Sequence, residues 1–170
     1  FLEGIELFST PNQLVYTRRI VDPIGGGKFT GKIGKTGIAV LTAADDVGAG
    51  RAWVTMARVR QDLGSDSLAG LTYTDRTEDG AFNRVIAADA RIVFKKLYYL
   101  LGQVGSSWTD RSGETRQAPM WQAEFDRTAR SWGFNYKLVG FGEAFETQSG
   151  YVPRSNFVEL HASNRFTHCG

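Results

Sequence analysis

The chain alternates apolar and polar residues over about ten segments of roughly ten residues each. A period of two places successive side chains on opposite faces of a strand, so this pattern predicts amphipathic β-strands. The predicted strands are 13–20, 28–34, 36–44, 52–61, 67–75, 83–95, 97–108, 118–131, 133–142 and 157–168. In 83–95, Ile86, Ile92 and Phe94 share one face and Asp89 and Arg91 the other. Residues 118–131 also have fair helix propensity, but their alternation favours a strand.

The connections between these segments alternate in predicted length. The short ones are Lys35, Asp62–Asp66, Lys96 and Trp132, and the longer ones are 21–27, 45–51, 76–82, 109–117 and 143–156. Short turns at one end and long loops at the other are typical of outer-membrane β-barrels, whose long loops are extracellular. We therefore predict an all-β, antiparallel up-and-down meander of about ten strands, forming a transmembrane β-barrel or the N-terminal part of one. Phe1 would start on the periplasmic side.

Composition narrows the class of protein only partly. A mean hydropathy of −0.26 and 22% charged residues suit a soluble protein, and they equally suit a barrel in which every second residue faces lipid. No run of 18 or more apolar residues is present, so no membrane-spanning helix is expected. A net charge of +2 with scattered cations gives no reason to expect nucleic acid as a partner. One cysteine, Cys169, rules out an internal disulfide framework.

Two sets of residues are the candidates for function. The polar set lies within predicted strands and would line a lumen: Arg58, Arg60, Asp89, Arg91, Glu124, Asp126, Arg130 and Lys137. The aromatic set lies near predicted segment ends and would sit at the two membrane interfaces: Trp53, Tyr73, Tyr98, Tyr99, Trp108, Trp121 and Trp132. In a soluble barrel or sandwich the rings would instead fill the core and the charges would face water. The sequence alone does not distinguish whether the apolar face points out to lipid or into a core.

Motifs for chemistry are weak. Residues 25–36 resemble a phosphate-binding loop, but Ile33 replaces the required hydroxyl residue and a strand is expected to follow. Asp75, Glu78 and Asp79 are weak candidates for a metal site, because Ile86 stands where a calcium loop needs its closing glutamate. No nucleophile is paired with a nearby histidine, and no two carboxylates have a selective spacing. We expect no cofactor and no enzyme activity; an uncharacterised hydrolase-associated module is the alternative.

Several stretches, in order, resemble a bacterial outer-membrane β-barrel domain, the domain-of-unknown-function family 5916. They are FLEGIELF at 1–8, RRI at 18–20, GGGKFTGKIGK at 25–35, RVRQDLGSDSLAGLTYTDR at 58–76, FNRVIAADARIVF at 82–94 and SGYVPR at 149–154. The family domain usually follows a family 9-like carbohydrate-binding module. The resemblance implies the outer membrane of a Gram-negative bacterium and carries no catalytic residues over to this chain.

The resemblance also implies partners and boundaries. Family members are longer, so residues 1–12 would be a leading segment and 13–170 an incomplete barrel domain. The expected partners are the lipid bilayer and either the remaining barrel strands or an N-terminal sugar-binding-like module. The expected function is part of an outer-membrane barrel that binds or transports a glycan-related solute. The alternative is a soluble all-β ligand-binding domain, lipocalin-like or a sandwich.

Overall fold

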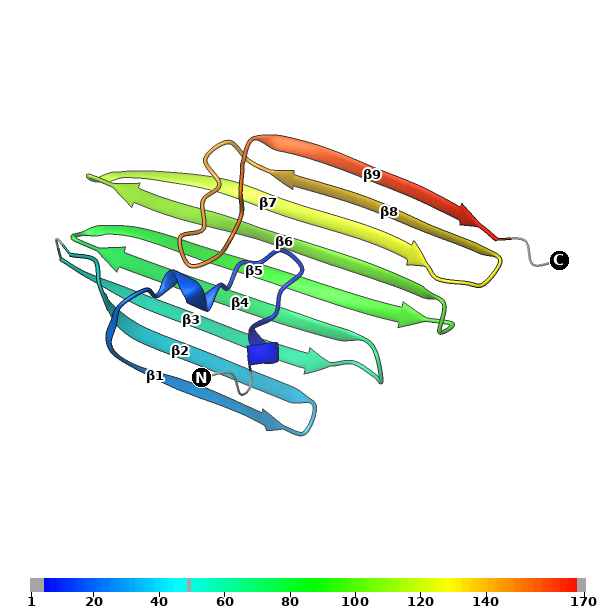
Figure 1. Ribbon diagram of the computed structural model, residues 1–170, viewed down its shortest axis with the longest axis horizontal. Helices are drawn as coiled ribbons and strands as arrows, with labels where there is room; N and C mark the ends of the chain where they lie inside the picture. The colour runs from blue at the N-terminus through cyan, green and yellow to red at the C-terminus, as the bar shows by residue number, and fades with distance from the viewer. Residues whose placement is uncertain (1–4, 49, 168–170) are drawn as a thin grey trace.

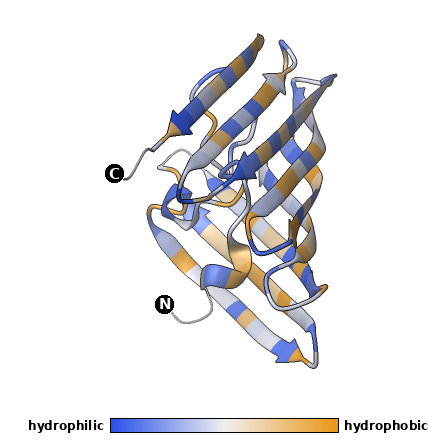
Figure 2. Cartoon of the chain, turned by 90° about the vertical axis from the view of Figure 1, so that its right-hand side faces the viewer, coloured by the Kyte–Doolittle hydropathy of each residue, from blue (hydrophilic) through white to orange (hydrophobic). Residues whose placement is uncertain are grey.

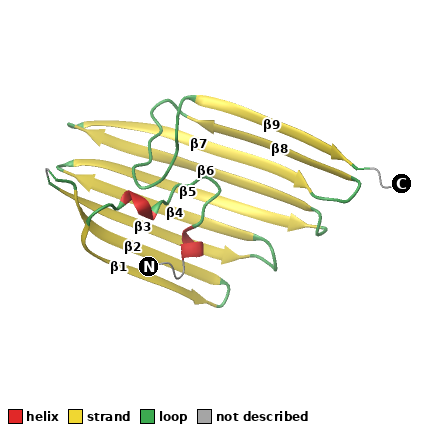
Figure 3. Cartoon of the chain, in the orientation of Figure 1, coloured by secondary structure: helices red, strands yellow, loops and turns green. Residues whose placement is uncertain are grey.

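Nine strands form one antiparallel sheet in the computed structural model, which describes residues 5–48 and 50–167 (Figure 1). The strands are β1 (Pro23–Ile33), β2 (Thr36–Asp46), β3 (Arg51–Asp62), β4 (Leu68–Glu78), β5 (Ala81–Phe94), β6 (Tyr98–Arg111), β7 (Glu114–Arg127), β8 (Trp132–Phe141) and β9 (Phe157–Phe166). Two short 3₁₀ helices, η1 (Ile5–Phe8) and η2 (Thr17–Arg19), precede the sheet (Figure 3). Each strand pairs with its neighbours in chain order. The predicted all-β antiparallel meander is therefore confirmed, and the strand alternative for 118–131 is correct over β7.

The sheet is open. β1 and β9 form its two edges on opposite sides of the molecule, and within the described part of the chain they are not paired with each other (Figure 1). The predicted strand at 13–20 is wrong, and β1 begins at Pro23 instead. Leu14 and Val15 are both buried, which a strand with one covered face does not allow for consecutive residues. This stretch is covered on two sides and pairs with no strand of the sheet.

The predicted alternation of short and long connections is also wrong. β4 joins β5 through Asp79-Gly80 alone, and β6 joins β7 through Ser112-Gly113 alone. All four of these residues have positive φ angles, between 48° and 84°. This is the backbone of a two-residue hairpin turn, which favours glycine in its second position. Among the connections between the described strands, only the one from β8 to β9, residues 142–156, is long, so loop length does not orient the sheet.

The two faces of the sheet differ in composition and cover. Paired residues of neighbouring strands lie on the same face, so the register defines each face across all nine strands. Figure 2 shows the result as strands whose colour alternates along their length between hydrophilic and hydrophobic. We call the face that residues 5–22 cover the inner face, and the opposite one the outer face.

Residues 5–22 cross the inner face and make the core with it (Figure 1). Near the β1–β2 turn, Leu7 and Phe8 pack on a cluster from β2 and β3 that includes Leu41 and Met56. Further along, Leu14 is 0% exposed and joins a second cluster from β5, β7, β8 and the 142–156 loop. Among the described residues, the buried apolar side chains therefore lie on the inner face, between the sheet and two irregular segments, except for Ala44, which pairs with Trp53 on the outer face.

Candidate functional site

The outer face is an uncovered apolar surface. Every exposed large apolar side chain of β2 to β9 lies on it, and so do two from β1. They are Phe29, Ile33, Trp53, Val59, Leu71, Ile86, Ile92, Phe94, Leu100, Val104, Trp132, Tyr136, Leu138, Val158, Leu160 and Phe166. Soluble monomers rarely expose contiguous apolar patches larger than a few hundred Å². The outer face, with large apolar side chains exposed on every strand from β1 to β9 except β2 and β7, is therefore unusual for a soluble monomer.

Charged side chains on the outer face are confined to its margins. Arg84 forms an ion pair with Asp75 (3.4 Å). Both residues are in register with Trp108, near the end of the sheet where the 142–156 loop connects β8 to β9. Arg127 lies at the opposite end, where its guanidinium stands over the rings of Tyr98 and Trp132. Between these two rows the described outer face carries no charged residue. The uncharged surface is thus a band that runs across the strands.

The height of this band can be compared with a bilayer. On β6 the band extends from Tyr98 to Trp108, a length of about 33 Å at roughly 3.3 Å per residue. At a strand tilt of about 40°, as in outer-membrane barrels, this length would correspond to a height of about 25 Å, which is the height of their apolar band.

Six of the seven predicted interface aromatics lie on the outer face. Trp132 and Tyr98 belong to a continuous ring cluster with Phe94, Phe125 and Phe134, at the end opposite the 142–156 loop. Trp53 and Trp108 lie toward the other end. The expectation that these rings lie near segment ends is wrong for two of them, because Tyr73 and Trp121 lie in the middle of β4 and β7.

The remaining member of the aromatic set is on the inner face. Tyr99 follows Tyr98 directly in β6, so its side chain points to the opposite side of the sheet. Its hydroxyl donates a hydrogen bond to Glu124 Oε1 (2.5 Å), and the Arg91 guanidinium lies 5.1 Å from its ring centroid. Tyr99 therefore belongs to a polar network and lies on the opposite side of the sheet from the other six rings.

A buried ion pair dominates the polar inner face. Arg58 on β3 donates two hydrogen bonds to Asp89 on β5, with N–O distances of 2.6 and 2.8 Å, and a third to Thr72 on β4. Both charged side chains are almost fully buried, at 1% and 2% exposure. Gly70 makes room for the pair, because a Cβ there would lie 2.5 Å from Arg58 Nη2. The pair therefore joins β3 to β5 across β4 on the inner face.

The other predicted lumen-facing residues lie on the inner face, with the exception of Arg130. Glu124 and Asp126 both accept hydrogen bonds from Asn135 Nδ2, and Lys137 is the pairing partner of Glu124. Arg60 lies 3.6 Å from Asp62 near the end of β3. All of these residues, with Arg91, share the inner face. Arg130 does not, because it lies in the β7–β8 turn and not in a strand.

Polar bonds hold the N-terminal segment on this face, a feature that sequence reasoning missed. Asn12 donates its side-chain amide to both Gln103 Oε1 and Gln122 Oε1 (2.8 Å each), and its backbone N–H to Gln103. The N–H of Tyr16 donates to the Ser149 carbonyl (2.8 Å), and the N–H of Tyr151 to the Gln13 carbonyl (2.7 Å). The segment and the 142–156 loop therefore close over the inner face together.

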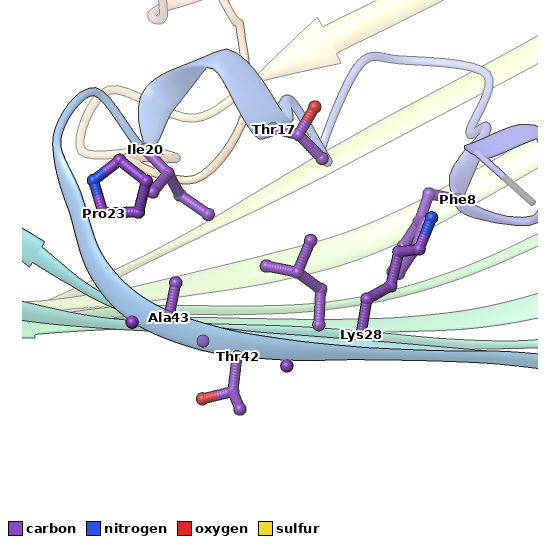
Figure 4. Close-up of a pocket in the computed structure, with 11 residues that line it drawn as sticks. Phe8, Thr17, Ile20, Pro23, Lys28, Thr42 and Ala43 are labelled. Atoms are coloured by element: carbon purple, nitrogen blue, oxygen red, sulfur yellow. The ribbon is translucent and has the colours of Figure 1, made fainter. Parts of the chain in front are cut away.

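A cavity of about 520 Å³ lies between this segment and the edge of the sheet. Figure 4 shows Phe8, Ile20 and Pro23 around it, while Thr42 points away to the other side of the strand. The floor is β1 with its run of glycines, 25–27, together with Leu41 and Ala43 of β2. The walls are therefore mostly apolar.

The weak metal candidates do not come together. Asp75 lies on the outer face and pairs with Arg84, while Glu78 pairs with Arg76 (3.1 Å) on the inner face. Asp79 is in the two-residue turn. Among the described residues, no group of three acidic, histidine or cysteine side chains could hold a metal ion. The geometry therefore offers no metal centre in this region.

In the described part of the chain, no helix is both long and apolar enough to cross a membrane.

Comparisons with known proteins do not identify the family of this chain. The resemblance to family 5916 stays a prediction. No family model, no curated protein and no solved structure matches this chain.

Proposed function

We propose that this chain is part of an outer-membrane β-barrel, with its outer face toward lipid and its inner face toward the barrel interior. The observation that carries the proposal is the uncharged band of the outer face, which extends about 33 Å along β6 from Tyr98 to Trp108. At the strand tilt of outer-membrane barrels, this length corresponds to their apolar band of about 25 Å. Charged side chains gather on the opposite face, where lipid does not reach them. In a soluble protein the same strands would turn their apolar side chains inward.

The open edges set a requirement for this proposal. In hydrocarbon each unpaired backbone N–H or C=O costs several kcal/mol, so a sheet cannot remain open in a bilayer. β9 is exposed on both of its faces, apart from the half-buried Phe157. Its partner would be a further antiparallel strand with apolar residues on the lipid side. The remaining strands of the barrel, named as partners from the sequence, fill this role.

The four tryptophans provide a direct test, because Trp53, Trp108, Trp121 and Trp132 all lie on the outer face. The experiment reconstitutes the protein in phospholipid vesicles and measures fluorescence quenching by lipids brominated in the middle of the acyl chain. A variant that keeps only Trp121, in the middle of β7, should be quenched most strongly. Variants that keep only Trp53 or Trp132 should be quenched less, because these residues lie near strand ends.

The control places a tryptophan away from lipid. In a chain whose native tryptophans are replaced by phenylalanine, Tyr151→Trp puts the fluorophore in the exposed 142–156 loop. Aqueous iodide should quench it, and brominated lipid should not. If Trp121 behaves like this control, or the protein stays folded and monomeric in detergent-free buffer, the barrel proposal is wrong.

We also propose, from the resemblance to family 5916, that the barrel transports a glycan-related solute. Leu14 is fully buried on the inner face, and the 142–156 loop lies beside it. A solute that follows the inner face would therefore have to displace this segment. Conductance across planar bilayers would test this: deletion of residues 5–16 should raise conductance over that of the full chain, and equal conductance would contradict it.

The apolar cavity favours a second function, a soluble domain that binds a small apolar ligand. Its volume of about 520 Å³ lies within the usual range of small-molecule sites. The test is binding of an environment-sensitive apolar dye in detergent-free buffer. Ala43→Phe, which fills the cavity, should abolish this binding, whereas Ala123→Phe on the outer face should leave it unchanged.

A further inference from the structure

A second concavity lies at the end of the sheet where the N-terminal segment enters β1. It has a volume of about 810 Å³ and is bounded by η2, the last residues of β4 and the 142–156 loop. Its lining differs from that of the apolar cavity, because arginine and tyrosine side chains are prominent in it. Arg18 and Arg19 come from η2, Arg76 from β4, and Arg154 from the loop.

The carboxylates at this concavity already have cationic partners. Glu78 accepts from Arg76 (3.1 Å), and Glu146 accepts from Arg111 with both oxygens (2.8 and 2.9 Å). Arg154 pairs with Glu159 (3.1 Å). Within the described part of the chain, Arg18 and Arg19 therefore have no carboxylate partner. The concavity has an excess of positive charge at η2.

The walls hold this charge in a fixed place. The Nε of Arg19 donates to the Gly150 carbonyl (3.1 Å), which leaves its two terminal nitrogens available. The rings of Tyr16 and Tyr151 are in contact, with centroids 6.1 Å apart. Thr147 also lines the space, and its buried hydroxyl has no hydrogen-bond partner among the described residues. A planar guanidinium can donate two parallel hydrogen bonds to two oxygens of a phosphate or carboxylate, and a preorganised guanidinium loses little entropy on binding.

We propose that this concavity binds a solute oxyanion, a phosphate or a carboxylate, through Arg18 and the terminal nitrogens of Arg19. Tyr16 and Tyr151 line the same concavity, and their hydroxyls would donate to further oxygens of the solute. The site does not depend on whether the outer face meets lipid, because all of its residues belong to the inner side of the molecule.

Isothermal titration calorimetry at low ionic strength tests the site, with the full chain in whichever medium keeps it folded. Pyrophosphate and citrate are the two probes, and they distinguish phosphate from carboxylate as the group preferred. We expect one bound anion per chain for at least one probe, with affinity that falls as salt is added. Maltose, which is uncharged, should not bind at this place.

Variants assign the binding to η2. Arg18→Ala should weaken binding about tenfold, because one charge-assisted contact is lost. This variant keeps the bond from Arg19 to Gly150, so the fold should persist, and unchanged circular dichroism would verify this. The double variant Arg18→Ala/Arg19→Ala should abolish measurable binding. The matched control, Arg116→Ala/Arg130→Ala, removes the same charge from exposed positions elsewhere. Failure of both probes to bind, or equal weakening in the control, overturns the proposal.

Discussion

The two faces of this sheet are formed by the same strands but differ in which side chains are covered. On the inner face, buried charges are matched within the chain, as Arg58 and Asp89 are, and the apolar side chains are covered by residues 5–22 and the 142–156 loop. On the outer face, large apolar side chains are exposed and charges stand only at the margins. The inner face is therefore largely covered within this chain except at β9, whereas the outer face is left uncovered. Substitutions on the two faces should respond differently to the medium.

The largest effect is expected at the buried ion pair. Asp89→Ala leaves the Arg58 guanidinium buried without a counter-charge, which should lower the free energy of unfolding by about 3–5 kcal/mol. Guanidinium titration followed by tryptophan fluorescence measures it. The control is Asp75→Ala, which removes a partly exposed pair of the outer face and should cost less than about 1 kcal/mol. Equal losses would break the contrast between the faces.

Leu14 tests the cover of the inner face. Its side chain is fully buried against both the sheet and the 142–156 loop, so Leu14→Ala should cost about 2–5 kcal/mol through lost contacts and the cavity left behind. Leu160→Ala, on the exposed outer face of β9, is the matched truncation and should change stability by less than about 1 kcal/mol. A small effect at Leu14 would mean that the segment does not pack on the sheet in solution.

Val104 tests the surroundings of the outer face. It is 60% exposed within the uncharged band, beside Trp121 on β7. In vesicles, Val104→Arg should lower the free energy of unfolding by about 2–4 kcal/mol, whereas Asn164→Arg, near the end of β9, should cost about 0–1 kcal/mol. Unfolding titrations of both variants in vesicles measure the difference. A neutral Val104→Arg would favour the soluble alternative.

Trp121 tests how tightly side chains pack on the outer face. Its ring lies over Gly140 of β8, where a Cβ would stand 2.5 Å from ring atoms. Gly140→Ala should therefore cost about 1–3 kcal/mol through the forced shift of the ring. At Gly102 of β6 an added Cβ meets nothing within 4 Å, so Gly102→Ala should be neutral or slightly stabilising. Thermal unfolding of the two variants should separate them, and identical melting temperatures would count against this packing.

The period of two predicted much of this structure. It located the strands from β2 to β9 to within a few residues, and it placed Arg58, Asp89 and Glu124 together on one face, because side-chain direction in a strand follows from local geometry alone. The alternation in β7 also outweighed its helix propensity. Strand position and side-chain direction could therefore be predicted, because both depend on residues that are neighbours in the sequence.

The errors came from turns and from contacts distant in sequence. The pairs Asp79-Gly80 and Ser112-Gly113 are typical two-residue turn sequences, and their glycines were a signal for shorter connections than the ones predicted. Residues 13–20 suggested a strand, but distant contacts decide their structure: Leu14 is buried by residues more than 60 positions away, and Val15 packs in the cluster from β2 and β3. The oxyanion site joins η2 to the 142–156 loop, and no local pattern could indicate that contact.

The order of the strands also bears on how the chain reaches this structure. Every pairing in the sheet joins neighbours along the chain, so each hairpin closes only a short loop of backbone and little entropy is lost at each step. The bonds from Asn12 to Gln103 and Gln122 are different, since they span 91 and 110 residues. Contacts of such separation form slowly. The hairpins should therefore assemble first, and residues 5–22 should settle onto an inner face that already exists.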